Sequence, residues 1–142
     1  MLNVLLIGMP IVWGNLLLQT HINVWSIRYY LRKSGQSTRD AQGAWPLFGV
    51  ITILMFGTML QIALWGALFW WLDEFPTLET AIYHSGVNFS TLGYGDLVMS
   101  AKWRLLGPLE AINGALMISL SGATILALLQ QQLRDKFRGT AN

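Results

Sequence analysis

The chain has 142 residues, of which 54% are hydrophobic and only 11% are charged, whereas about 25% of the residues of an average soluble domain are charged. This composition excludes an ordinary soluble domain, and the absence of cysteine excludes a disulfide framework and a cysteine-based metal site. The net charge is only +2 and its basic residues flank apolar segments, so no nucleic-acid partner is expected. We expect a small membrane protein without a separate soluble domain.

The first apolar stretch runs from Met1 to about Leu18 and can continue as a helix to Ile27. It has neither a preceding basic residue nor a small-residue cleavage site, so we interpret it as a retained helix rather than a signal peptide. Pro10 is a candidate kink. Three polar residues make this span the least lipid-like: Asn15, His21 and Asn23. We predict an N-terminal transmembrane helix over residues 1–27.

Residues 28–45 are predicted to form a basic linker, and the second apolar stretch follows it. Leu47–Leu72 contains no charged residue, and at about 1.5 Å per residue it is longer than a hydrocarbon core of about 30 Å. We therefore predict a tilted outer helix over residues 46–72. Three tryptophans near its end are placed like an interfacial aromatic belt: Trp65, Trp70 and Trp71.

The next segment, residues 77–89, is too short to cross a bilayer. Thr77 follows Pro76 and is a good N-cap, and Glu79 lies near the positive end of the helix dipole. A short helix that leads directly into a glycine-rich loop is a re-entrant element. Irregular backbone at membrane depth occurs only where protein or a water-filled cavity surrounds it, so this segment indicates a pore.

The loop that follows reads Thr91-Leu92-Gly93-Tyr94-Gly95-Asp96. Glycine allows backbone conformations that side chains disfavour, and such conformations at alternate residues let successive carbonyls point the same way. Stacked rings of backbone carbonyls from four chains replace the hydration shell of a potassium ion. The loop resembles the selectivity filter of the pore-loop potassium channel family, whose usual pattern is Thr-Val-Gly-Tyr-Gly-Asp, and five of the six positions match.

This resemblance implies a homotetramer in which each chain supplies one quarter of a potassium-selective filter over residues 91–96. The implied ion ligands are backbone carbonyls, with the Thr91 hydroxyl as an additional ring: those of Thr91, Leu92, Gly93 and Tyr94. The implied filter supports are Gly95, Asp96, Val87 and Ser90. The side chains of Leu92 and Tyr94 would point away from the ions, and Asp96 would anchor the loop to the pore helix at the outer mouth. The end of that helix would direct its negative dipole end at a central cavity.

Two positions depart from the family pattern. Leu92 replaces the usual β-branched valine and is less restricted at its first side-chain torsion, which favours a non-selective cation channel as the alternative function. Tyr83 and His84 replace an aromatic pair that is common in relatives. His84 is either a titrating group that bonds to Asp96 and makes the outer mouth sensitive to pH, or a neutral packed histidine.

The third apolar stretch starts at Leu105 or Pro108, and we predict an inner helix over residues 105–129. Glu110 is its only carboxylate. A helix start near Pro108 places Glu110 in the first turn, where the dipole stabilises it; the alternative is that Glu110 supports the filter from behind. Residues 130–142 are predicted to form a short tail.

Small side chains recur every four residues along this helix: Ala115, Ser119, Ala123 and Ala127. Such a stripe is typical of close helix packing in membranes. The resemblance gives a second interpretation, in which Ser119, Ala123 and Ala127 line the cavity and lower gate. Gly114 lies within one residue of the family's usual hinge glycine.

Seven of the nine basic residues lie in the linker or the tail: Arg28, Arg32, Lys33, Arg39, Arg134, Lys136 and Arg138. The positive-inside rule then places the linker and the C-terminus in the cytoplasm, and the N-terminus and the glycine loop outside. We expect a multi-pass protein of the cell (inner or plasma) membrane. The linker is either a topology signal or a contact for anionic lipid head groups.

The sequence therefore predicts an all-α membrane protein, with three transmembrane helices, a re-entrant pore helix and a filter, which conducts K+ passively as a tetramer. The pore domain is predicted to span residues 46–129. The alternatives are a non-selective cation channel and a non-conducting membrane subunit or adaptor. No enzyme and no cofactor other than the permeant ion is expected, because the two histidines, His21 and His84, are far apart and lack a catalytic arrangement.

Overall fold

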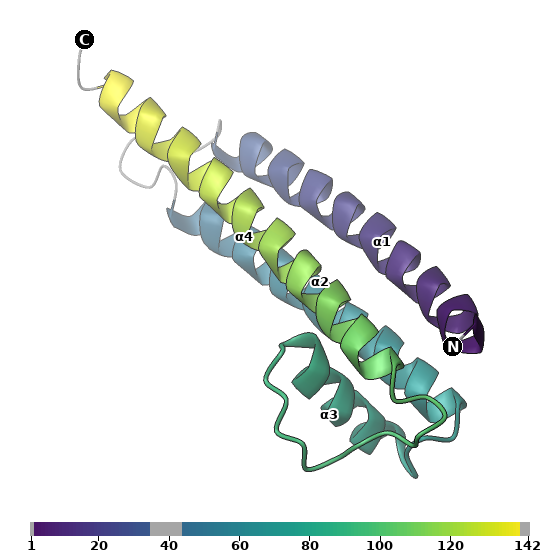
Figure 1. Ribbon diagram of the computed structural model, residues 1–142. Coiled ribbons are helices and arrows are strands. Elements are labelled where there is room, and N and C mark those ends of the chain that lie inside the picture. The colour runs from purple at the N-terminus through teal and green to yellow at the C-terminus, as the bar shows by residue number, and fades with distance from the viewer. Residues whose placement is uncertain (1, 35–43, 140–142) are drawn as a thin grey trace.

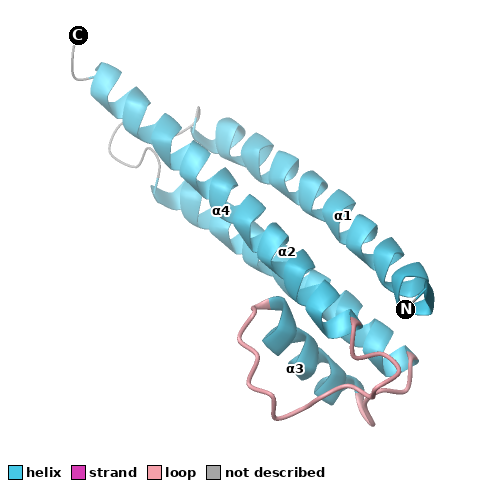
Figure 2. Ribbon diagram, viewed as in Figure 1, coloured by secondary structure: helices cyan, strands magenta, loops and turns pink. Residues whose placement is uncertain are grey.

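The computed structural model of the chain describes residues 2–34 and 44–139. Within these residues it contains four helices: α1 (Leu2–Ser34), α2 (Ala44–Trp71), α3 (Leu78–Phe89) and α4 (Leu106–Gly139). The described residues contain no strand (Figure 2). The predicted all-α fold is therefore confirmed.

The three long helices lie side by side, and the short helix α3 lies next to one end of the bundle (Figure 1). Helix α1 packs against α2 and α4, and α3 packs against the same two helices. The start of α1 lies at the same end of the bundle as α3 and its loops, whereas the end of α4 lies at the opposite end. This arrangement is that of a chain with three membrane-spanning helices and a short re-entrant helix between the second and the third.

Helices α1, α2 and α4 are each long and apolar enough to cross a membrane. Helix α3 has 12 residues and reaches about 18 Å, which is shorter than a hydrocarbon core of about 30 Å. The prediction of three spans and one re-entrant helix is therefore confirmed. Helix α1 is continuous through Pro10, the candidate kink.

Two helices extend further than the sequence predicts. Helix α1 continues to Ser34 instead of ending at Ile27, and α4 continues to Gly139 instead of ending at Leu129. Both added segments lack proline, and basic residues near a C-terminus interact favourably with the helix dipole. The remainder of the linker, including Arg39, and the last three residues of the tail lie outside the described residues.

The larger hydrophobic core lies at the end of the bundle that carries α3, and it combines side chains from all four helices and their loops. Its buried members are Val4, Trp65, Leu68, Phe69, Phe75, Ala81, Phe89, Trp103, Leu106 and Met117. A smaller core joins the three long helices towards the opposite end: Tyr30, Val50, Leu54 and Leu128. The short helix is therefore fixed to the bundle by the larger core.

Trp65 differs from its predicted place in an interfacial belt. Its side chain is fully buried, and its Nε1–H donates to Asn113 Oδ1 at 3.1 Å. Hydropathy identifies the span but not the direction of each side chain, and an indole N–H in a core requires an acceptor. Trp70 and Trp71 are exposed, as expected of belt residues.

Helix α1 is joined to the other long helices by polar contacts. Asn15 Nδ2 donates to Asn113 Oδ1 at 2.9 Å, and Gln19 Nε2 lies 2.8 Å from Ser121 Oγ, so both contacts reach α4. Gln61 Nε2 of α2 donates to Gln19 Oε1 at 2.7 Å. Polar contacts of this kind favour helix association within lipid. They account for Asn15 among the polar residues that make this span unusual, whereas Asn23 and His21 bond within α1, to Gln19 and to the carbonyl of Leu17.

Candidate ion-conduction site

The N-terminus of α3 is capped as the sequence predicts. Thr77 has extended backbone geometry, and its hydroxyl accepts the backbone N–H of Thr80 at 3.2 Å. Glu79 lies in the first turn, where a negative charge is favourable. The helix therefore starts at Leu78, directly after its cap.

Helix α3 approaches its two neighbours closely at two glycines. A Cβ added at Gly66 of α2 would lie 2.8 Å from the Cα of Ile82. A Cβ added at Gly114 of α4 would overlap the backbone of Phe89. Helix α4 is continuous through Gly114, so the predicted hinge position is also the place where the end of the short helix contacts α4.

The C-terminus of α3 ends in a Schellman motif. The N–H of Thr91 donates to the carbonyl of Asn88 at 2.8 Å, and the N–H of Leu92 donates to the carbonyl of Val87 at 3.0 Å. These two bonds are the pair that defines the motif, with Thr91 at the left-handed position. Ser90 Oγ also donates to the carbonyl of Gly86 at 2.7 Å. The glycine loop is thus attached directly to the helix end.

Positive φ angles occur at alternate residues of the loop: Thr91 at 60°, Gly93 at 62° and Gly95 at 74°. A Cβ at either glycine would meet no atom of this chain, so conformation rather than space requires glycine there. The alternation that aligned carbonyls need was predicted for the glycines and is present. Thr91 continues the alternation because it occupies the left-handed position at the end of α3. Its spacing of two residues from Gly93, the same as that between Gly93 and Gly95, was the sequence feature that could have predicted its positive φ.

Asp96 connects the loop to α3, as the resemblance implies. Its Oδ2 accepts the hydroxyl of Tyr83 at 2.7 Å, and its Oδ1 accepts the backbone N–H of Leu97 at 3.1 Å. The hydrogen bond to the carboxylate raises the pKa of Tyr83, because loss of the phenol proton would leave two negative groups in contact.

Glu74 forms a second connection at this end of the bundle. Its carboxylate accepts the backbone N–H of Ser100 at 2.7 Å and the Ser100 hydroxyl at 2.6 Å. The bond joins the segment before α3 to the segment after the glycine loop. No local sequence pattern predicts this pair, because the partners are 26 residues apart.

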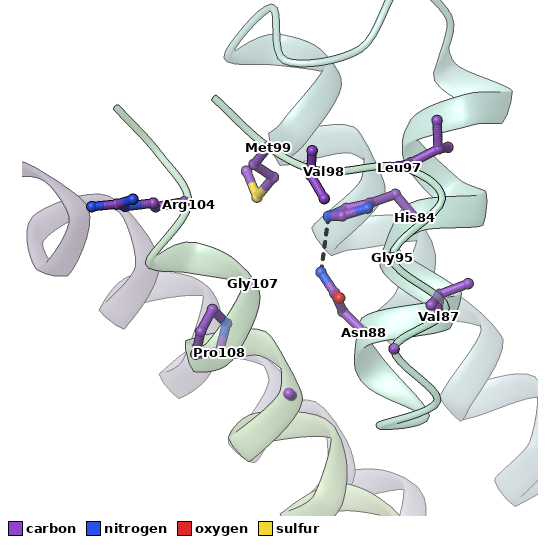
Figure 3. A pocket seen from close by; sticks show the side chains of 12 residues that line it. His84, Val87, Asn88, Gly95, Leu97, Val98, Met99, Arg104, Gly107 and Pro108 are labelled. Carbon is purple, nitrogen blue, oxygen red and sulfur yellow. Dashed lines mark hydrogen bonds between the residues drawn. The ribbon is translucent and has the colours of Figure 1, made fainter. Parts of the chain in front are cut away.

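His84 is the neutral packed histidine of the two predicted alternatives. Its ring is buried against Phe69 and Phe75, with ring centroids 5.7 and 4.6 Å away. Asn88 Nδ2 lies 2.9 Å from His84 Nε2 (Figure 3); an amide nitrogen only donates, so this ring nitrogen accepts. Burial lowers the pKa of His84. Its hydrogen-bond partners are Asn88 and the backbone of Leu97, and not Asp96.

One side of the loop borders a cavity of about 490 Å³ between α3 and the start of α4 (Figure 3). Gly93 and Gly95 line it together with His84, Asn88 and Arg104, among others. Every residue from Thr91 to Asp96 is exposed. A single chain therefore leaves the whole glycine loop uncovered.

Residues 50–131 match the ion-channel family model. They comprise most of α2, all of α3, the glycine loop and most of α4, which is more than half of the chain. The chain belongs to the ion-channel family. No curated protein and no solved structure matches it.

The channel thus consists of an outer helix α2, a pore helix α3, a glycine loop and an inner helix α4, with α1 outside the matched residues. Family membership indicates ion transport across a membrane rather than catalysis. Among the described residues, no cluster of His, Cys, Asp or Glu could hold a metal ion.

The inner helix of the channel has a buried and an exposed face. Its buried positions include Asn113, Met117, Thr124 and Leu128. The stripe of small residues lies on the exposed face: Ala115, Ser119, Ala123 and Ala127. Within one chain this stripe is therefore not covered by the other helices.

Glu110 lies further from the start of α4 than the first of its two predicted roles requires. Helix α4 starts at Leu106 rather than Pro108, so Glu110 lies in the second turn, and its side chain is fully buried. Glu110 Oε1 lies 2.5 Å from Ser85 Oγ of the pore helix. The first-turn interpretation is wrong, because the helix begins earlier than proline placement suggests.

Proposed function

We propose that four copies of the chain surround a central axis and conduct K+ selectively through residues 91–94. The observation that carries this proposal is the alternation of positive φ at Thr91, Gly93 and Gly95, attached to the C-terminal end of a re-entrant helix. The carbonyls of Thr91, Leu92, Gly93 and Tyr94 are the proposed ion ligands, and the Thr91 hydroxyl adds a ring. Gly95, Asp96, Val87 and Ser90 hold this segment in place.

Exposure of the loop supports assembly. Tyr94 is 67% exposed and Leu92 is 54% exposed, although side chains that brace a filter need packing partners. Neighbouring copies supply these partners in a tetramer, and the exposed stripe of α4 then faces the axis or a neighbouring helix. Gly114, Ser119, Ala123 and Ala127 are accordingly the proposed hinge and cavity positions.

A non-selective cation channel is the second candidate function, and Leu92 is the residue that favours it. Leucine has more freedom at its first torsion than valine, and within one chain the Leu92 side chain is more than half exposed. A loosely braced filter discriminates less between K+ and Na+. We favour selectivity because both glycines and Asp96 are in place.

The deciding experiment is the reversal potential of the purified protein in liposomes with opposed K+ and Na+ gradients. A selective channel approaches the potassium limit, about 59 mV for a tenfold gradient. Gly93→Ala should lose this potential, because alanine disfavours the positive φ of that position. Gly14→Ala is the matched control: a Cβ there meets no atom and no positive φ is needed.

Each other outcome has a distinct meaning. A potential near zero with robust current establishes the non-selective channel. A monomer or dimer without flux, measured by mass photometry on the same sample, establishes the non-conducting subunit or adaptor. The tetramer with a K+ potential that Gly93→Ala removes supports the proposed function.

We also propose the orientation that the basic residues predict, with the N-terminus outside and the C-terminus in the cytoplasm of a cell membrane. The described basic residues Arg28, Arg32 and Lys33 lie at the end of α1 that is opposite the filter. This end is suited to anionic lipid head groups. Protease protection of tags at the two termini in intact cells tests the orientation.

A further inference from the structure

Glu110 is the one carboxyl side chain among the described residues that is fully buried. It projects from the inner helix towards the pore helix, where Ser85 is also fully buried. Ser85 lies two residues before Val87, whose carbonyl accepts the N–H groups of Leu92 and Gly93. The position of Ser85 therefore affects the start of the filter.

The hydroxyl of Ser85 is close to two oxygen atoms. It lies 2.8 Å from the backbone carbonyl of Ile62 in α2 and 2.5 Å from Glu110 Oε1 in α4. A serine hydroxyl has one proton to donate, and both a carbonyl and an ionised carboxylate only accept. An ionised Glu110 thus leaves two acceptors competing for a single hydrogen.

A proton on Glu110 removes this conflict. The carboxylic acid donates from Oε1 to Ser85 Oγ, and Ser85 donates to the carbonyl of Ile62, so each close pair of oxygens has its own hydrogen. Glu110 Oε2 has no hydrogen-bond partner in the structure. Ser85 and Asn88, the hydrogen-bonding side chains beside the carboxyl group, are both neutral, and a buried charge without a cation is far more costly than a neutral acid in the same place.

We propose that Glu110 is a positioning residue: as a neutral carboxylic acid it links the inner helix through Ser85 to the outer helix and so fixes the pore helix behind the filter. The link acts across α4, α3 and α2 in turn. It is continuous with the contact between Gly114 and Phe89, one turn further along α4. Two neighbouring attachments then hold the C-terminal half of α3.

Infrared difference spectroscopy tests the protonation state without any measurement of ion flux. At neutral pH the wild-type protein should show the carbonyl stretch of a protonated carboxylic acid, and Glu110→Gln should lack it. Glu79→Gln should retain it, because Glu79 is exposed on the same pore helix. Identical wild-type and Glu110→Gln spectra in this region would overturn the proposal, whatever the channel conducts.

Ion flux tests the positioning role, and this part rests on the proposed function. Glu110→Gln keeps a neutral donor to Ser85 and should retain the wild-type K+ flux and reversal potential. Glu110→Leu and Ser85→Ala each break the link and should lower K+ flux about tenfold, the order of a lost buried hydrogen bond.

Three outcomes of the flux measurements are decisive. Wild-type flux in both link-breaking variants, or loss of flux in Glu110→Gln with the fold intact by circular dichroism, contradicts the positioning role. If Glu110→Leu does not fold, Ser85→Ala, which changes only a hydroxyl, carries the comparison. A wild-type protein that shows the acid band but no K+ flux contradicts the proposed function and leaves the protonation of Glu110 standing.

Discussion

Thr91 holds a conformation that a β-branched residue rarely adopts, with φ at +60°. The reason is its place at the left-handed end of a Schellman motif, where glycine is the usual residue. Asp73 occupies the equivalent position after α2, with φ at 61° and the same pair of hydrogen bonds, from its own N–H to Trp70 and from the Glu74 N–H to Phe69. Two helix ends therefore have a non-glycine residue in the strained left-handed conformation.

Replacement of these two residues by glycine separates stability from function. Thr91→Gly and Asp73→Gly should each raise the free energy of unfolding by about 0.5–1 kcal/mol, since relief of the left-handed strain outweighs the entropy of glycine. Only Thr91→Gly should reduce K+ selectivity, because it also removes the hydroxyl that the proposed function assigns to an ion-binding ring. Thermal unfolding in detergent and reversal potentials check both effects; equal selectivity in the two variants contradicts a role for the Thr91 hydroxyl.

His84 gives the fold a dependence on pH. Its pKa lies below the ordinary value of 6.5 because the ring is buried, with the backbone hydrogen bond to Leu97 and the charges of Asp96 and Glu74 partly offsetting the effect. The unfolded chain therefore binds a proton first as the pH falls, so the stabilisation is complete above about pH 6.5 and is lost as the pH falls towards the lowered pKa. The midpoint temperature of unfolding should drop between about pH 7.5 and pH 5.

The variant that isolates this effect is His84→Gln, which keeps an acceptor for Asn88 but cannot titrate. Its midpoint temperature should fall less over the same pH range than that of the wild-type protein. Parallel pH profiles of the two proteins would assign the loss of stability to other groups and leave His84 a packing residue only.

At the scale of elements, the pore helix depends on the closeness of α4. A Cβ at Gly114 would overlap the backbone of Phe89, and backbone cannot move aside as a side chain can. Gly114→Ala should therefore displace the end of α3, destabilise the protein by about 1–3 kcal/mol and reduce K+ flux. Unfolding and flux measurements check this, with Gly14→Ala as control, which should not destabilise α1. A variant that changes gating without loss of stability favours the hinge instead.

The type and the approximate position of most elements were predictable from local sequence features. Apolar runs gave the three spans, Thr77 gave the start of the pore helix, and the glycine loop gave the positive φ at Gly93 and Gly95. Contacts between distant segments were not predictable. The inward direction of Trp65 and the bond from Glu74 to Ser100 depend on which helices meet, and no local pattern encodes that. The helix ends at Ser34 and Gly139 were not predicted, because hydropathy indicates where a chain leaves the lipid and not where its helix ends.

At the scale of the whole molecule, α1 is an addition to the region that matches the family model, which starts at residue 50. It contacts both the outer and the inner helix. Gln19 is the centre of these contacts, since it reaches Gln61 in α2, Ser121 in α4 and Asn23 in its own helix. Helix α3 contacts α2 and α4, and α1 packs on the same two helices, so α1 is joined to the two helices that hold α3 and the glycine loop.

Removal of this centre should weaken the bundle without changing the filter. Gln19→Leu leaves the buried Gln61 amide without its acceptor and should cost about 1–3 kcal/mol of unfolding free energy. Thr20→Val is the matched control, because the neighbouring Thr20 is exposed and bonds only to its own helix at Leu16. Thermal unfolding in detergent should separate the two variants, while both keep the wild-type reversal potential. A changed reversal potential in Gln19→Leu would show instead that α1 acts on the filter itself, and equal stability of the two variants would show that lipid-facing packing, not the polar contacts, holds α1 in place.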